Sequence, residues 1–137
     1  MNRADFQQLA EDRVRDAEAL LNVGQWSGAY YLVGYAVECA LKACIAKLTN
    51  QYDFPDKETA QKCYSHNVDV LLDLAGLITQ RKTDTALNRT LSDNWLIVRK
   101  WDEKARYQQW SEFKARELFV AITDTSNGVL TWIKAFW

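Results

Sequence analysis

Two charged side chains, Glu38 and Lys42, interrupt an otherwise apolar, aromatic or small-residue stretch at residues 29–45. On a helix at about 100° per residue they share one stripe, about 60° wide, with Tyr31 and Tyr35. Because buried charges are kept where they are paired and hydrogen-bonded, this stripe could direct two hydroxyls, a carboxylate and an ammonium into a pocket.

Two other interpretations of the stripe stay open. Glu38 and Lys42 could form an (i, i+4) pair on the one strip of the helix that meets water, which contributes a few tenths of a kcal/mol. A membrane span is disfavoured, because the stretch is short of the roughly 20 apolar residues required and its charges lie well inside it.

The only histidine of the chain, His66, directly follows a polar segment at residues 49–65 and opens a predicted short helix. A lone histidine is usually structural, and the dipole at a helix N-terminus disfavours its protonation. The alternative is a polar contact or a general base for a phosphate-bearing ligand.

The segment from Arg99 to Arg116 is locally basic and rich in aromatic residues. This mixture suits a nucleotide or a single-stranded nucleic acid, which would be held by phosphate contacts and base stacking. The alternative is a set of core tryptophans with solvated charges around a helix junction. The residues concerned are Arg99, Lys100, Lys104, Arg106, Lys114 and Arg116, with Trp101, Tyr107, Trp110 and Phe113 between them.

Other kinds of site have little support in the sequence. Zinc needs three or four Cys, His or carboxylate ligands, and one histidine with three scattered cysteines predicts neither a metal nor a cofactor. GxSxG, P-loop and GxGxxG motifs do not occur. A bound nucleotide would therefore be held by side chains and helix ends.

Length and composition predict one soluble domain, residues 1–137. With 48% hydrophobic residues the chain can build one core but is too short for two ordinary domains. The 17 Lys and Arg residues against 18 Asp and Glu residues give no global argument for nucleic acid or a membrane. The N-terminus lacks a secretory apolar core and no CxxC pair occurs, so we expect a cytoplasmic protein without a membrane partner.

The elements that must position these residues are helices, because one proline, five glycines and no alternating apolar pattern predict an all-α fold. Helices at residues 4–23, ended by Gly24, and at 27–48, capped by Ser27, should lie antiparallel. Residues 49–65 should form a loop, with a possible helical turn at 56–63.

Three further helices are predicted, and the stretch at residues 100–110 shows no helical pattern. Ser65 and Ser111 are the expected caps of the first and the last of them. Asn127-Gly128 marks the expected kink or break in the last. The three helices cover residues 66–76, 84–99 and 111–136.

These segments resemble, in their order and spacing, the HEPN domain (higher eukaryotes and prokaryotes nucleotide-binding) from about Asp5 to Trp132. The resemblance implies an antiparallel bundle of four long helices with a short extra helix, and nucleotide- or RNA-related work. It also implies a homodimer, with which the aromatic C-terminus at residues 132–137 agrees. The segments are 24–30 (GQWSGAY), 34–43 (GYAVECALKA), 54–55 (FP), 65–66 (SH), and Trp101 with 105–107 (ARY).

The resemblance also implies a shared cleft for the polar residues. Arg106 and Lys42 would hold phosphate, and Tyr107 or Tyr35 would stack on a base. Relatives often work beside a small nucleotidyltransferase, in toxin–antitoxin-like pairs, so such a partner is expected. The predicted ligand-binding residues are Tyr35, Glu38, Lys42, His66, Arg106 and Tyr107.

One departure from the family pattern bears on catalysis. Ribonuclease members resemble one another in an arginine followed four to six residues later by a histidine, but YQQWSEF follows Arg106 here. We therefore expect a protein that binds without cutting. The alternatives are a metal-independent ribonuclease with a rebuilt site, using His66 as base and Arg106 on the phosphate, and a purely structural dimerisation module.

Overall fold

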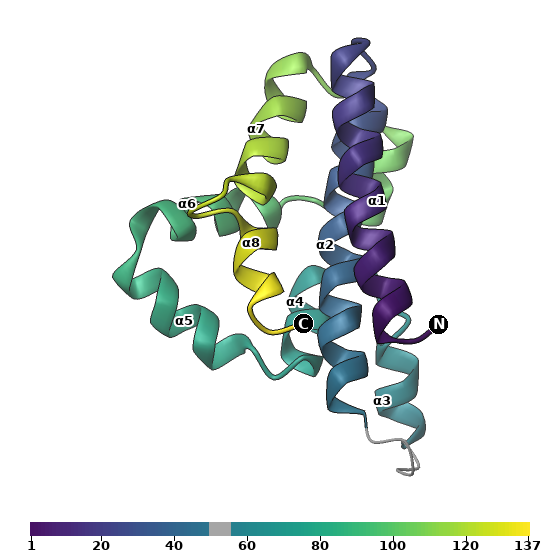
Figure 1. Cartoon of the computed structure of the whole chain (residues 1–137), viewed down its shortest axis with the longest axis vertical. Helices are drawn as coiled ribbons and strands as arrows, with labels where there is room; N and C mark the ends of the chain where they lie inside the picture. The colour runs from purple at the N-terminus through teal and green to yellow at the C-terminus, as the bar shows by residue number, and fades with distance from the viewer. Residues whose placement is uncertain (50–55) are drawn as a thin grey trace.

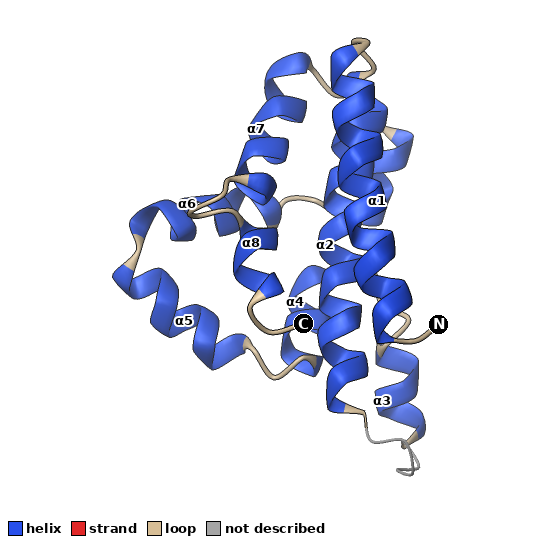
Figure 2. Cartoon of the chain, in the orientation of Figure 1, coloured by secondary structure: helices blue, strands red, loops and turns tan. Residues whose placement is uncertain are grey.

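The structure is a computed structural model that describes residues 1–49 and 56–137. Within these ranges it contains helices and no strand, which confirms the all-α class (Figure 2). Two long helices, α1 (Arg3–Asn22) and α2 (Trp26–Leu48), lie antiparallel and pack side by side along their lengths, as predicted (Figure 1). Several later elements pack on the other sides of α2.

The α1–α2 hairpin begins with a capping box and ends in a tight turn. Asn2 and Asp5 exchange side chain-to-backbone hydrogen bonds of 2.9 Å at the start of α1. Gly24 follows the end of α1 with a φ of 77°, which confirms its predicted role. The predicted cap at Ser27 is wrong, because α2 already begins at Trp26; the Ser27 hydroxyl instead accepts a hydrogen bond from the Trp110 backbone N–H at 2.8 Å.

Helix α2 is the core of the molecule, which explains its apolar composition. It contacts α1, α4 (Val68–Leu74), α7 (Glu112–Thr123), α8 (Val129–Lys134) and the 3₁₀ helix η1 (Glu103–Tyr107). Its length and composition alone would allow it to cross a membrane. However, most of its apolar surface is buried inside the fold, as in the core helix of a soluble protein.

The segment after α2 contains more helix than the sequence predicted. The possible turn is a short helix, α3 (Lys57–Lys62), capped by Asp56. The predicted cap at Ser65 is wrong: Asn67 caps α4, so His66 precedes this helix instead of opening it. The Ser65 hydroxyl accepts a hydrogen bond from the Asn67 backbone N–H. Residues 50–55 of the predicted loop, with the Phe54-Pro55 motif, lie outside the described residues.

The helix predicted at residues 84–99 is two helices, α5 (Ile78–Leu87) and α6 (Arg89–Val98). Asn88 separates them with an extended backbone and caps α6 by accepting a hydrogen bond from the Leu91 N–H at 3.1 Å. Its amide also donates to Asn127 Oδ1 at 2.7 Å. Helix α5 begins six residues earlier than predicted. Gly76, at a φ of 71°, reverses the chain directly after α4, and α5 begins two residues later, at Ile78.

The last predicted helix is also divided, at the place expected for a break. Ser111 caps α7 by accepting a hydrogen bond from the Lys114 N–H at 3.2 Å, which confirms that prediction. Gly128 then caps α8, and a Cβ at this position would lie 2.5 Å from the carbonyl oxygens of Ile122 and Asp124. Only glycine fits this turn without a shift of the backbone.

Candidate functional site

Glu38 lies at the centre of a buried polar cluster. Its side chain is 1% exposed. Its Oε1 atom accepts a hydrogen bond from Lys42 Nζ at 2.9 Å and also lies 2.9 Å from His66 Nδ1. Lys42 is also largely buried, at 17% exposure. The interpretation of the stripe as a solvated surface pair is therefore wrong.

His66 bridges two carboxylates. Its Nε2 lies 3.3 Å from Glu103 Oε2 on η1, on the opposite side of the ring from Glu38. Carboxylate oxygens only accept, so both contacts are hydrogen bonds only when the ring carries both protons. The ring is 46% exposed, so it lies at the edge where this cluster meets solvent. We call Glu38, Lys42, His66 and Glu103 the Glu38 cluster.

The packing of Trp101 on α2 places η1 beside this cluster. The buried indole lies directly on Gly34, where a Cβ would be 2.3 Å from Trp101 Nε1. Gly34 precedes Glu38 by one helical turn and therefore lies on the same face of α2. Asp102 then caps η1 by accepting a hydrogen bond from the Lys104 N–H at 2.7 Å. A small residue at position 34 thus allows Glu103 and Arg106 to approach the stripe.

The two tyrosines of the stripe form an aromatic row with Trp101. Their rings stack at 6.2 Å with planes 8° apart, and Tyr31 lies 5.9 Å from the Trp101 ring. Burial, together with the Cys39 thiol and Glu38, raises the pKa of Tyr35 to about 12. The Tyr35 hydroxyl is therefore a neutral hydrogen-bonding group at physiological pH.

Arg106 and Tyr107 extend this row to the surface. The guanidinium carbon of Arg106 lies 4.8 Å from the centre of the Tyr107 ring, a cation–π distance. Interaction with the Tyr107 side chain, and more weakly with Tyr31, raises the pKa of Arg106 above its usual value, so this side chain stays charged. Tyr107 is 77% exposed, so a flat ligand can reach its ring.

The structure thus brings the predicted residues onto one face of α2, in two groups. Lys42 and His66 each contact Glu38, while Arg106 and Tyr107 contact each other and lie near Tyr31. Glu103 was not predicted as a partner of His66. The sequence marks it only by its position two residues after Trp101, in a segment without helical periodicity.

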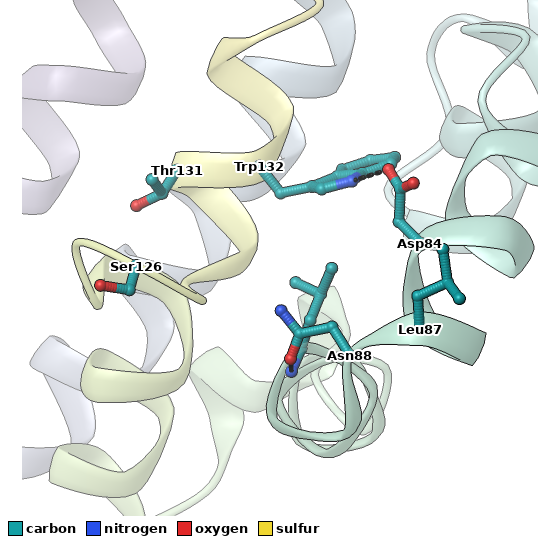
Figure 3. Close-up of a pocket in the computed structure, with 7 residues that line it drawn as sticks. Asp84, Leu87, Asn88, Ser126, Thr131 and Trp132 are labelled. Atoms are coloured by element: carbon teal, nitrogen blue, oxygen red, sulfur yellow. Dashed lines mark hydrogen bonds between the residues drawn. The ribbon is translucent and has the colours of Figure 1, made fainter.

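Three hollows in the surface involve other parts of the fold, although Lys42 of the stripe lines one of them. One of about 350 Å³ separates α5 and α6 from α8, where Asp84 Oδ2 accepts a hydrogen bond from Trp132 Nε1 at 2.8 Å (Figure 3). Another of about 450 Å³ lies between α6 and α7, and one of about 110 Å³ adjoins Lys42 and Cys63. None of these three is lined by His66, Arg106 or Tyr107.

The cysteines fit a structural role. Cys39 and Cys44 are buried in the core, and burial raises the pKa of each thiol to about 11. Cys63 is half-buried at the end of α3. Among residues 1–49 and 56–137, no three His, Cys, Asp or Glu side chains are placed to hold a metal ion.

Comparison with known proteins adds one family. The family model of the HEPN domain matches residues 5–135, which is nearly the whole chain. No curated protein and no solved structure matches this chain. The match supports nucleotide- or RNA-related work, in a family whose members are often dimeric. The chain belongs to the HEPN family.

Proposed function

We propose that this protein binds a nucleotide or an RNA end on the face of α2 next to η1, and that it does not cut the ligand. The observation that carries the proposal is the exposed Arg106–Tyr107 pair, held beside the stripe of α2 by the packing of Trp101 on Gly34. A guanidinium can bind phosphate through two parallel hydrogen bonds, and an exposed aromatic ring stacks on any base. The two groups are adjacent, as a nucleotide requires.

Lys42 has a different part in this proposal from the one expected from the sequence. Its ammonium lies 2.9 Å from the buried Glu38 carboxylate, and only 17% of the Lys42 side chain is exposed, so it is less available to phosphate than the exposed Arg106. Moving it away from Glu38 would leave a buried charge unpaired, which is strongly unfavourable. We therefore assign the phosphate to Arg106, with the exposed Lys104 of η1 nearby, and give Lys42 a role in fixing Glu38.

The contacts of His66 argue against the ribonuclease alternative. A general base needs an unprotonated nitrogen that faces the substrate. Both ring nitrogens of His66 instead face carboxylate oxygens, at 2.9 and 3.3 Å. No histidine stands among the seven residues after Arg106. We propose that His66 positions η1 against α2 and takes no part in chemistry.

The biological setting of the proposal comes from the resemblance. We propose a cytoplasmic protein that works with a small nucleotidyltransferase in a toxin–antitoxin-like pair. Expression of the chain with the products of neighbouring genes, followed by purification, tests this point. Copurification of a nucleotidyltransferase would support it.

A binding titration tests the proposed ligand site. ATP, GTP and a short RNA are titrated into the wild-type protein in a calorimeter, and the titration is repeated with Arg106→Ala. We expect about a tenfold or greater loss of affinity, the equivalent of roughly 1.4 kcal/mol. Arg89→Ala, which removes another exposed arginine on α6, is the matched control and should bind as the wild type does. No binding by the wild-type protein would refute the proposal and favour the structural module.

A further inference from the structure

The hollow between α5, α6 and α8 has the size of a small-ligand site. Its volume is about 350 Å³, at the lower end of the range for pockets that bind small molecules, which is roughly 300–1,000 Å³. Figure 3 shows its lining side chains around an open centre, with Trp132 of α8 on one side and Asn88, between α5 and α6, on the other. Segments that are far apart in the sequence thus meet at one cavity.

Asp84 is the charged group of this hollow, because the other residues that line it are all neutral. Its two hydrogen bonds also come from neutral groups. Trp132 Nε1 donates to Oδ2 at 2.8 Å, and Gln80 Nε2 donates to Oδ1 at 3.0 Å. No ion pair joins Asp84 to a Lys, Arg or His within the part of the chain that the structure describes. The hollow therefore has one negative charge and no counter-charge in its wall.

The hydrogen-bond donors around the hollow are mostly used inside the protein. The Trp132 N–H donates to Asp84, and the Thr131 hydroxyl donates to a backbone carbonyl oxygen at 2.7 Å. One N–H of the Asn88 amide donates to Asn127 Oδ1, also at 2.7 Å. Few donors are left for an anion, whereas an ionised carboxylate only accepts. A ligand of this hollow must therefore bring its own donors, and a positive charge favours it.

Apolar surface lies next to the carboxylate. The indole of Trp132 lines the hollow, and its N–H lies at Asp84. Leu91 is 5% exposed and Leu87 is 85% exposed, so these two leucines contribute to the floor and the rim. An aromatic ring attracts a cation that lies within about 6 Å of its centre. A carboxylate, an indole and two leucines together fit a cation that is joined to an aliphatic chain.

The position of Trp132 is fixed by contacts within the fold. The sequence suggested the aromatic C-terminus as a dimer surface; in the single chain the Trp132 ring packs on Trp95 at 5.7 Å and on Phe136 at 4.8 Å. The ring is therefore held in place without a ligand. A site that is ordered in advance loses less conformational freedom on binding than one that the ligand must order.

We propose that this hollow binds a protonated primary amine with a short aliphatic chain. The ammonium group donates hydrogen bonds to Asp84 beside the ring of Trp132, and the chain lies on Leu87 and Leu91. None of the residues that we assign to the nucleotide lines this hollow. It is a second site, and it does not depend on the proposed function.

An NMR titration of the wild-type protein tests the ligand class. The probe is n-butylammonium at constant ionic strength, and n-butanol is the neutral control with the same chain. The indole N–H of Trp132 reports on the site because it donates to Asp84, and its signal is identified as the one that Trp132→Phe removes. We expect this signal to shift with saturation at up to about 10 mM n-butylammonium, and to shift little with n-butanol.

A charge-removing variant tests the role of Asp84. Asp84→Asn keeps an oxygen that can accept from Trp132 and should weaken n-butylammonium binding about tenfold or more. Asp93→Asn alters an exposed aspartate of α6 that does not line the hollow, and it should bind as the wild type does. Circular dichroism and thermal melting check that both variants are folded, while the comparison of the two probes needs no binding-site variant.

Three results would each overturn the proposal. The first is a Trp132 signal that n-butylammonium does not move, or moves without saturation. The second is an equal shift with n-butanol, which would show that the charge is not recognised. The third is a folded Asp84→Asn variant that binds n-butylammonium as tightly as the wild type.

Discussion

The contact between Gly34 and Trp101 makes one substitution unusually informative. In Gly34→Ala the added Cβ would lie 2.3 Å from Trp101 Nε1 and 2.4 Å from Cδ1 and Cε2. These atoms belong to a buried, rigid ring, so the indole must move as a whole. Such overpacking costs about 1–3 kcal/mol, whereas Ala in place of Gly inside a helix contributes about 1 kcal/mol in the opposite direction.

We expect Gly34→Ala to lower the free energy of unfolding by up to roughly 2 kcal/mol. Contacts of 2.3–2.4 Å with a rigid ring put the overpacking cost in the upper part of its range, and the gain in helix propensity offsets only about 1 kcal/mol of it. Urea unfolding measures this, with the slope of the transition checked against the wild type. Gly28→Ala, in the same helix, is the matched control: its Cβ would meet only the flexible Cδ1 of Leu20, at 3.1 Å. It should stay within about 1 kcal/mol of the wild type.

A double-mutant cycle separates the clash from other effects of the substitution. In a Trp101→Leu background the indole is absent, so Gly34→Ala should no longer destabilise and should show the helix propensity of alanine alone. The double variant should therefore be more stable than the sum of the two single effects predicts. The difference, which is the coupling energy, should be about 1–3 kcal/mol, the cost of the clash. If Gly34→Ala is as stable as the wild type, or equally destabilising in both backgrounds, Trp101 does not pack on Gly34 as described.

Three further predictions concern buried groups. Glu38→Ala should destabilise by about 3 kcal/mol or more in urea unfolding, because it leaves the largely buried Lys42 ammonium unpaired. Glu103→Ala, at a half-exposed site, should lower stability by about 1 kcal/mol or less. The pKa of Tyr35 is about 12 in the fold against 10 in the unfolded chain, so the folded state holds its proton longer. Stability should therefore fall as pH rises from 10 toward 12, and absorbance at alkaline pH should show this tyrosine ionising after exposed ones. Ellman's reagent should reach Cys63 in the native protein and Cys39 only on unfolding, since Cys39 is buried with a pKa raised to about 11.

The features predicted correctly from the sequence are those with local causes. The apolar composition of α2 required burial on several sides, and its two charges at four-residue spacing had to share a face. Gly24 and Ser111 end and begin helices through contacts within a few residues. Gly128 was found because an Asn-Gly pair marks a break whatever surrounds it.

The errors have long-range causes. Apolar spacing continues through Asn88, so periodicity could not show that this residue turns away to contact Asn127, 39 residues later. Ser27 has the chemistry of a cap, but Trp110, 83 residues away, uses its hydroxyl. The contact between His66 and Glu103 likewise depends on the packing of η1 on α2, which the sequence around neither residue encodes.

The energetics of Glu38 bear on whether the cluster serves stability alone. Lys42 and His66 both use Oε1, and the buried Oε2 has no hydrogen-bond partner among the described residues. An unsatisfied buried acceptor costs about 1–3 kcal/mol, and buried ion pairs are often less stabilising than apolar side chains of similar size. A module that only had to hold α4 against α2 would be more stable with an apolar residue at position 38. The carboxylate instead fixes His66, and through Glu103 the turn that presents Arg106, which favours the binding proposal over the purely structural one.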